Sequence, residues 1–209
     1  MNDARREAIK GRFNDRAEDY DDSAMHRALA AAVADFIELD GVGTVLDVAT
    51  GTGLVLRALA ARQPSELRLV GVDLAPGMLE VARRELPAAE FIEGVAEELP
   101  VADSAADLVT CVTALHIFSD ALPVFEEFAR VLAPAGVLVT ATFAHAPDHG
   151  HGQGPGAPHT PGYEPNHAPY ATPEALAATA APAGFVLTRH ELRSIEGDEV
   201  LIAELAPVD

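Results

Sequence analysis

Residues 45–53 read VLDVATGTG, a short β-branched run that ends in an acid and passes into a turn with two glycines. Such a run predicts a buried strand, and Gly51 and Gly53 let a ligand approach the backbone because they have no side chain. The helix expected after the turn offers free N–H groups and the positive end of its dipole. In open α/β sheets, ligands bind where strands end in turns of this kind. The stretch therefore predicts a small-molecule pocket beside Asp47.

Strands and helices alternate along most of the chain. The expected strands span residues 42–49, 67–74, 89–95, 106–115 and 136–143, and the expected helices span 25–39, 54–62, 76–85 and 122–132. A helix at 173–181 and two closing strands at 185–192 and 199–205 follow. Short alternation of this kind predicts an α/β fold, a doubly wound parallel sheet with helices on both faces. The length of 209 residues suits one domain, residues 1–209.

A second acid stands where the next strand ends. Asp73 lies 20 residues beyond Gly53, the place of an acid that accepts hydrogen bonds from a ribose diol. A dinucleotide fingerprint would have a third glycine where Leu56 stands, and no Gly-Lys-Ser/Thr phosphate loop occurs. The two acids and the turn therefore favour a nucleoside site without a diphosphate.

Four motifs in order resemble a known family. These are VLDVATGTG, VGVDLAPGMLEVAR, FIEGVAEELPVADSAADLVTCVTALHIF and FEEFARVLAPAGVLVTATF, which together cover roughly residues 42–143. They resemble the class I S-adenosylmethionine-dependent methyltransferases, and within them the branch that acts on small molecules. The resemblance implies a Rossmann-like seven-stranded sheet whose last strand is antiparallel, and S-adenosyl-L-methionine as the cofactor.

The resemblance also implies a role for individual residues. The residues around the amino acid part of the cofactor would be Asp47, Ala49, Gly51 and Gly53, and Asp73 would hold the ribose hydroxyls. The adenine would meet Leu74, Met78, Val95 and Ala96, and the methionine portion would meet Val112 and Thr113. Two positions depart from the family pattern. Ala49 stands where glycine is frequent, and Val95 stands where an aspartate usually accepts the adenine amino group.

Two residues are candidates for catalysis. His116 follows the fourth strand and has the ordinary pKa range of a general base, although a structural histidine would fit there equally. Tyr20 belongs to residues 1–40, which we expect to form a helical lid, and it would touch the cofactor carboxylate or the acceptor, or pack against the sheet edge. Methyl transfer needs alignment more than it needs a fixed catalytic dyad.

Residues 145–170 interrupt the pattern with six prolines, five glycines and five of the eight histidines. We expect a loop insertion there. Asp148, His149 and His151 are close in sequence, yet the glycines and prolines provide no helix to fix a ligand geometry. A loop over the acceptor site, a segment without a role and a metal site are the alternatives, and we expect no metal.

Composition restricts the partners. The chain has 14 basic and 33 acidic residues, a net charge of -19, which disfavours nucleic acid as a ligand. The single cysteine, Cys111, excludes an internal disulfide. No apolar run is long enough to span a membrane and no signal core begins the chain, so we expect a cytoplasmic protein without membrane contact. Its oligomeric state stays open, a homodimer included.

The sequence thus favours a transferase, an S-adenosylmethionine-dependent methyltransferase for a small-molecule acceptor. One alternative is a module of the same fold that binds the nucleoside without transferring methyl groups, which Val95 keeps open. A nicotinamide-dependent oxidoreductase is the other, and Leu56 disfavours it.

Overall fold

The computed structural model describes residues 3–62, 67–144 and 164–208. Its seven strands form one sheet in the order β3-β2-β1-β4-β5-β7-β6. The first five strands pair in parallel, whereas β7 runs antiparallel to both β5 and β6. The strands are β1 (Thr44–Val48), β2 (Arg68–Asp73), β3 (Glu90–Glu93), β4 (Ala106–Val112), β5 (Leu132–Phe143), β6 (Phe185–Ile195) and β7 (Asp198–Pro207). The predicted fold class is confirmed.

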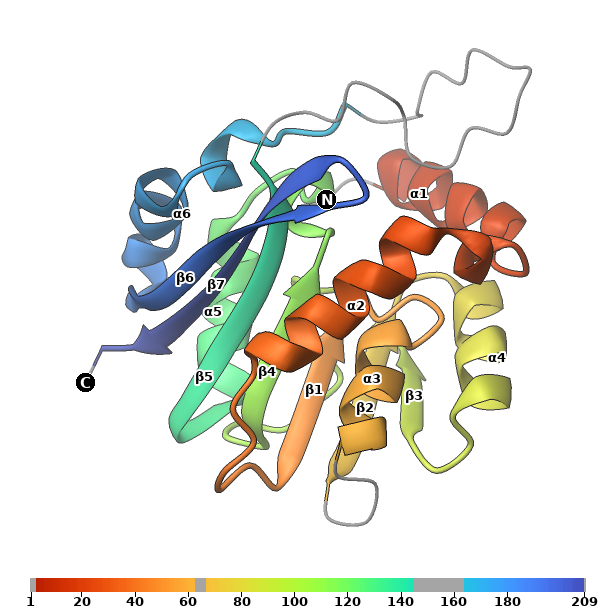
Figure 1. Ribbon diagram of the computed structural model, residues 1–209, viewed down its shortest axis with the longest axis horizontal. Helices are drawn as coiled ribbons and strands as arrows, with labels where there is room; N and C mark the ends of the chain where they lie inside the picture. The colour runs from red at the N-terminus through yellow and green to blue at the C-terminus, as the bar shows by residue number, and fades with distance from the viewer. Residues whose placement is uncertain (1–2, 63–66, 145–163, 209) are drawn as a thin grey trace.

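Helices cover both faces of the sheet (Figure 1). The front face carries α2 (Ala24–Phe36), α3 (Leu54–Arg62) and α4 (Pro76–Glu85), and the rear face carries α5 (Leu122–Val131) and α6 (Pro173–Ala180). The largely polar helix α1 (Asp3–Arg16) contacts α4 and lies across one end of the sheet (Figure 1). Short 3₁₀ segments, η1 to η4, occupy 20–22, 115–117, 168–170 and 181–183.

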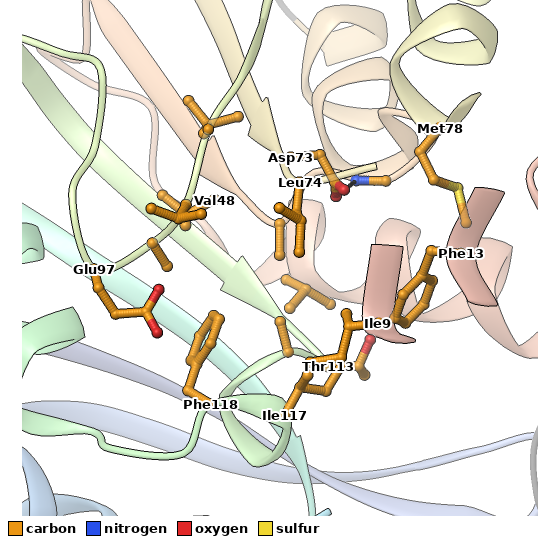
Figure 2. Close-up of a pocket in the computed structure, with 18 of the residues that line it drawn as sticks. Ile9, Phe13, Val48, Asp73, Leu74, Met78, Glu97, Thr113, Ile117 and Phe118 are labelled. Carbon is orange, nitrogen blue, oxygen red and sulfur yellow. Dashed lines mark hydrogen bonds between the residues drawn. The ribbon is translucent and has the colours of Figure 1, made fainter. Parts of the chain in front are cut away.

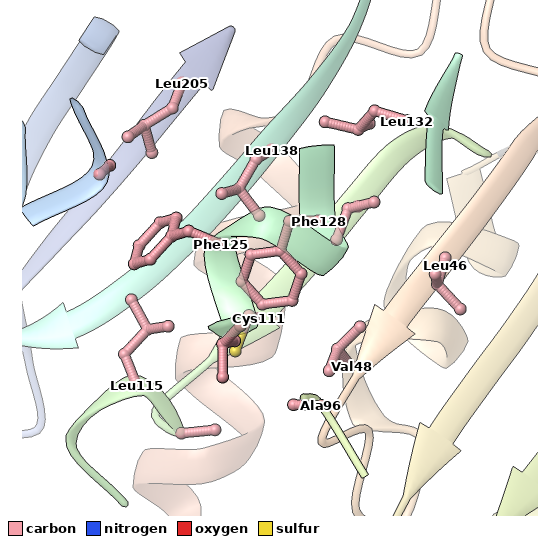
Figure 3. Packing of buried hydrophobic residues seen from close by; sticks show 14 of the residues in the cluster. Leu46, Val48, Ala96, Cys111, Leu115, Phe125, Phe128, Leu132, Leu138 and Leu205 are labelled. Carbon is pink, nitrogen blue, oxygen red and sulfur yellow. The ribbon is translucent and has the colours of Figure 1, made fainter. Parts of the chain in front are cut away.

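Two hydrophobic clusters hold the layers together, one on each face of the sheet. On the rear face, Phe125 and Phe128 of α5 meet edge to face at 5.7 Å between ring centroids (Figure 3). Leu46, Leu138 and other strand residues pack around the two rings. Because both faces are covered, the central strands are mostly apolar, as expected of a parallel sheet, and their buried polar side chains are Asp47 and a few threonines.

The element boundaries agree closely with the sequence patterns. The helices α3 and α4 begin and end where their periodicity predicts. By contrast, β4 ends at Val112 because residues 115–117 form η2, and β5 begins at Leu132 across a register irregularity in its pairing with β4. At the other end of the chain, Glu196 and Gly197 both have positive φ angles and close the β6–β7 hairpin.

Strand order places the functional end of the sheet. The chain leaves β1 toward β2 on one side, while β4 lies on the other side of β1. Ligands in such sheets bind beyond the carboxyl ends of the strands at this switch point. The residues 145–163 of the expected loop insertion lie outside the described residues. In the part of the chain that the structure describes, every helix is too short or too polar to cross a membrane.

Candidate functional site

A cavity of about 720 Å³ opens at the carboxyl ends of β1, β2 and β4 (Figure 2). The floor comes from the strand ends, and one wall comes from α1 through Ile9 and Phe13. Predicted site residues make up much of the lining: Tyr20, Ala49, Gly51, Asp73, Leu74, Met78, Val95, Ala96, Val112 and Thr113.

The two glycines of the turn have different functions. Gly51 has a φ of 55°, and a Cβ built on it would meet nothing within 4 Å, so the backbone there is open to a ligand. Gly53 has a φ of 78°, and its added Cβ would lie 3.3 Å from the Phe91 ring. Gly53 does not line the cavity, and its lack of a side chain instead lets α3 begin close to β3 and α4. The expected ligand contact therefore falls on Gly51.

Asp73 connects the end of β2 to this turn. Its two carboxylate oxygens accept hydrogen bonds from the backbone N–H groups of Gly51 and Ala75, each at 2.8 Å. Burial raises the pKa of Asp73, and these N–H donors offset part of that effect. A carboxylate accepts about four hydrogen bonds, so Asp73 keeps capacity for the two hydroxyls of a ribose.

Asp47 lies deeper, at the end of β1, and is only 2% exposed. It accepts hydrogen bonds from the hydroxyls of Thr50 and Thr110, both at 2.6 Å. The pKa of Asp47 is raised to about 6, mainly because the carboxylate is buried. The hydrogen bonds from the two hydroxyls act in the opposite direction, and the nearby Asp73 charge adds to the effect of burial. Asp47 does not line the main cavity; it lines a second cavity of about 420 Å³ next to it.

The second cavity continues from the first. It shares lining residues with the main cavity, namely Tyr20, Ala49, Gly51, Val112 and Thr113. The helix α2 closes it with His26, Leu29 and Ala30. Together the two cavities form one elongated site around the glycine turn, with Asp73 at the larger chamber and Asp47 at the smaller.

His116 lies elsewhere. It lines neither cavity and stacks on His167, with 4.2 Å between ring centroids. Burial, and to a smaller extent the charge of His167, lowers the pKa of His116 to about 3. Its backbone carbonyl accepts the N–H of Asn166, so η2 is tied to residues near η3. The geometry gives no support to His116 as a general base.

Several cavity residues were not anticipated from the sequence. Ile9 and Phe13 stand one helical turn apart on α1, and Ile117 and Phe118 follow β4. Glu97 brings a carboxylate into the main cavity, on the side opposite Asp73 (Figure 2). The four-residue spacing on α1 was a detectable signal for an apolar face. The position of Glu97, four residues after β3, had no comparable signal.

The N-terminal helices are fastened over the site by polar contacts. The Asn14 side chain accepts the N–H of Gly77 at 2.8 Å, and Lys10 donates to Glu93 at 2.5 Å. In η1, Asp21 accepts the Thr52 hydroxyl at 2.5 Å and forms an ion pair with Arg57. Thr52 lies between the two glycines of the turn, so Asp21 joins the N-terminal segment directly to the ligand-facing backbone.

Metal binding has no visible basis in the described residues. Within them, no group of three or more His, Cys, Asp or Glu side chains is placed to hold an ion. Asp148, His149 and His151 lie outside the described residues.

Known proteins resemble this chain in sequence. A family model described as "Methyltransferase domain" matches residues 45–136. A demethylmenaquinone methyltransferase of Chlorobaculum parvum is 44% identical over 92 residues, which is 44% of this chain and 37% of the relative. Another of Renibacterium salmoninarum is 34% identical over 149 residues, 68% of this chain and 62% of the relative. The chain thus spans less than two thirds of the length of these relatives.

Solved structures share the fold over most of the chain. A SAM dependent methyltransferase from Aquifex aeolicus has a TM-score of 0.70 at 19% identity, covering 92% of this chain and 98% of its own. The [4+2]-cyclase SpnF has a TM-score of 0.65 at 22% identity, covering 88% and 82%. At these identities the likeness shows the fold alone.

Proposed function

We propose that this chain carries a class I S-adenosylmethionine-dependent methyltransferase domain and that it methylates a small-molecule acceptor, which the matching family model, the relatives and the shared fold support. The observation that carries the proposal is the pairing of Gly51 and Asp73 at the mouth of an apolar cavity. The turn leaves room for the cofactor to touch the backbone, and the carboxylate has acceptor capacity for ribose hydroxyls. These residues fit S-adenosylmethionine.

The adenosyl part would lie in the main cavity. Leu74 and Met78 provide apolar surface on one side, and Ile117 provides it on another (Figure 2). Val95 lines the cavity without a polar side chain, whereas Glu97 places its carboxylate in the same chamber. Apolar walls of this kind exclude water and strengthen the few polar contacts that orient the ligand.

Bound S-adenosylmethionine supplies a methyl group with a thioether as its leaving group. The chain's contribution is alignment, which for well-oriented reactants is worth about 7–11 kcal/mol. Ala49, Val112 and Thr113 line both cavities, at the point where the two chambers meet. Tyr20 lies at the same junction, and we assign it to contact with the cofactor or the acceptor. An acceptor that loses its proton before binding needs no base from the protein.

The acceptor is a small molecule in this proposal, and a quinone-type ring is the first to test. Curated relatives named demethylmenaquinone methyltransferase support that choice. Another relative, a Biotin biosynthesis bifunctional protein BioHC from Cellvibrio japonicus, is 34% identical over 134 residues. Relatives with different named roles mean that the acceptor has to be established by assay.

Methyl transfer from labelled S-adenosylmethionine to demethylmenaquinone with a short side chain tests the proposal, with a panel of phenols, amines and carboxylic acids beside it. We expect a labelled product whose mass exceeds that of the acceptor by one methylene group. Calorimetry with S-adenosylmethionine and S-adenosylhomocysteine accompanies the assay. A protein that binds neither of these two compounds would contradict the proposal. Binding without transfer to any acceptor would favour the alternative, a binding module of the same fold.

A further inference from the structure

The strand β6 forms one edge of the sheet, and β3 forms the other (Figure 1). The two edges differ in length, because β6 has 11 residues and β3 has 4. Among the residues that the structure describes, β7 is the only strand that pairs with β6, so the outer side of β6 has no strand beside it. A long open edge is a template for pairing with another extended chain. The side chains of β6 indicate which chain fits.

The second half of β6 is its regular part. From Arg189 to Ile195 the pairing with β7 runs without interruption. This segment begins after the register irregularity between Leu187 and Arg189, and it ends at the hairpin turn of residues 196–197. Its midpoint is Leu192, whose side chain is 54% exposed. A two-fold axis through Leu192 would therefore align the whole regular segment with the same segment of a second copy.

We propose that two copies of this chain associate through β6, antiparallel and centred on Leu192, and so join their sheets into one. In this register Leu192 lies opposite the partner's Leu192, and Glu191 lies opposite the partner's Arg193. Directly opposite residues of an antiparallel pair lie on the same face, with Cβ atoms about 5 Å apart. The inference goes beyond the proposed function, since no residue of 189–195 lines either cavity.

The charges of Glu191 and Arg193 select this register. The two side chains form an ion pair within the chain, and each is about one third exposed. Because the order of residues reverses in an antiparallel partner, the acid of each copy meets the base of the other. A register centred on Glu191 would place that carboxylate against its own copy and Arg189 against the partner's Arg193. Like charges directly opposite each other destabilise a strand pair.

A register centred on His190 is disfavoured for another reason. It would pair Glu191 with the partner's Arg189, but Arg189 is already held by Glu204 at 2.8 Å and lies over the Phe36 ring. It would also run into the irregularity after Leu187. The register centred on Leu192 avoids both problems.

The overall charge of the chain points to the same strand. A net charge of -19 makes two copies repel each other across most of their surfaces. The strand β6 has two arginines and one acid, so its own charges do not add to this repulsion. At the other edge, β3 begins and ends with a glutamate. Of the two edges, β6 is thus the one that a second copy can approach.

Sedimentation equilibrium of the full chain tests the proposal through charge reversal. We expect a wild-type dimer that dissociates on dilution. Glu191→Arg and Arg193→Glu, each alone, should weaken the dimer by at least about 10-fold, because each places like charges opposite each other. A mixture of these two variants should form a mixed dimer, since every introduced charge then meets its opposite. The double variant E191R/R193E should associate like the wild type.

A second pair of variants tests the apolar centre. Leu192→Lys should also weaken the dimer, whereas Val186→Lys, at a 47% exposed position outside the regular segment, is the matched control and should not. Circular dichroism verifies that each variant is folded. A wild-type protein that stays monomeric at its highest soluble concentration would overturn the proposal. So would a dimer that neither single charge reversal weakens, or single variants that do not associate when mixed. A wild-type dimer that binds no adenosyl ligand would instead overturn the proposed function alone.

Discussion

Asp73 is the residue on which the site depends most. Its carboxylate holds the N–H groups of Gly51 and Ala75 and faces the main cavity (Figure 2). The same side chain therefore shapes the glycine turn and presents an acceptor to a ribose.

Asp73→Asn should reduce cofactor affinity sharply. An asparagine has one acceptor oxygen, so one of the two backbone N–H groups loses its partner, and the charge that binds the ribose diol is lost. We expect calorimetric binding of S-adenosylhomocysteine to weaken by about 10- to 100-fold. Asp40→Asn, at an exposed position before β1, is the control. An unchanged affinity in a folded Asp73→Asn protein would exclude the ribose role.

Ala49 has an unusual backbone for its residue type. Its φ of 57° lies in the left-handed region, which costs an L-residue roughly 1–2 kcal/mol. Ala49→Gly removes that strain but adds freedom to the unfolded chain, so we expect the free energy of unfolding to rise by about 0.5–1 kcal/mol. Urea denaturation measures it. The same change at Ala31, exposed within α2, should lower the stability by about 1 kcal/mol. Destabilisation by both substitutions would contradict this reading of the turn.

His116 should make stability sensitive to acid. Its folded-state pKa of about 3 lies below the ordinary unfolded value of about 6.5, so the unfolded chain binds more protons between these values. The contribution is complete above pH 6.5 and is lost progressively as the pH falls toward 3. Urea midpoints measured from pH 7 to pH 4.5 should fall less steeply for His116→Gln than for the wild type. Parallel pH profiles of the two proteins would refute the prediction, and His190→Gln serves as the control.

At the scale of elements, the N-terminal segment is fastened to the ligand turn. Its 3₁₀ turn η1 carries Asp21, which binds Thr52 and Arg57, and Thr52 is only 1% exposed. The contact crosses from a segment outside the sheet to the first turn after β1. We propose that residues 1–40 act as a lid whose closure is coupled to the turn through Asp21.

Asp21→Asn should loosen this lid. The substitution removes the charge that faces Arg57 and weakens the bond from Thr52. We expect faster amide hydrogen exchange across residues 3–23 and S-adenosylhomocysteine affinity reduced by about 3- to 10-fold. Asp22→Asn changes the neighbouring exposed residue and should leave both measurements as in the wild type. Unchanged exchange in Asp21→Asn would show that the lid is held by other contacts.

Local patterns predicted the elements well because each signal is local. The periodicity of α3 and the proline that begins α4 depend only on neighbouring residues. The start of β5 was predicted four residues too late, because pairing with β4 and not local propensity extends it. Strand limits depend on a partner strand, which the local pattern does not contain.

At the scale of the whole molecule, the site residues also divide into those that the sequence pattern predicts and those whose position depends on tertiary packing. Gly51 and Asp73 were predictable because the fold brings the ends of adjacent parallel strands together. Glu97, His26 and the α1 side chains reach the cavities from segments whose placement depends on tertiary packing. His116 follows a strand end like a site residue, yet η2 turns its ring toward His167. A position beyond a strand indicates nearness to the site but not the direction of the side chain.

The two cavities share five lining residues and lie side by side at the carboxyl ends of the strands. The larger cavity is apolar apart from a few polar groups, and the smaller cavity contains the Asp47 carboxylate. This division corresponds to a cofactor with a nucleoside at one end and an amino acid at the other. If the cofactor fills both cavities, the proposed lid and the segments after it would determine which acceptor binds. In α/β proteins, specificity comes from the residues of the site and not from the fold.

A crystal structure of the full chain with S-adenosylhomocysteine tests the central claim most directly. We predict the ribose hydroxyls on the Asp73 carboxylate, the adenine in the main cavity and the amino acid tail in the second cavity, near Asp47. Density for the ligand away from the strand ends, or a bound nucleoside that leaves Asp73 without contact, would contradict the account.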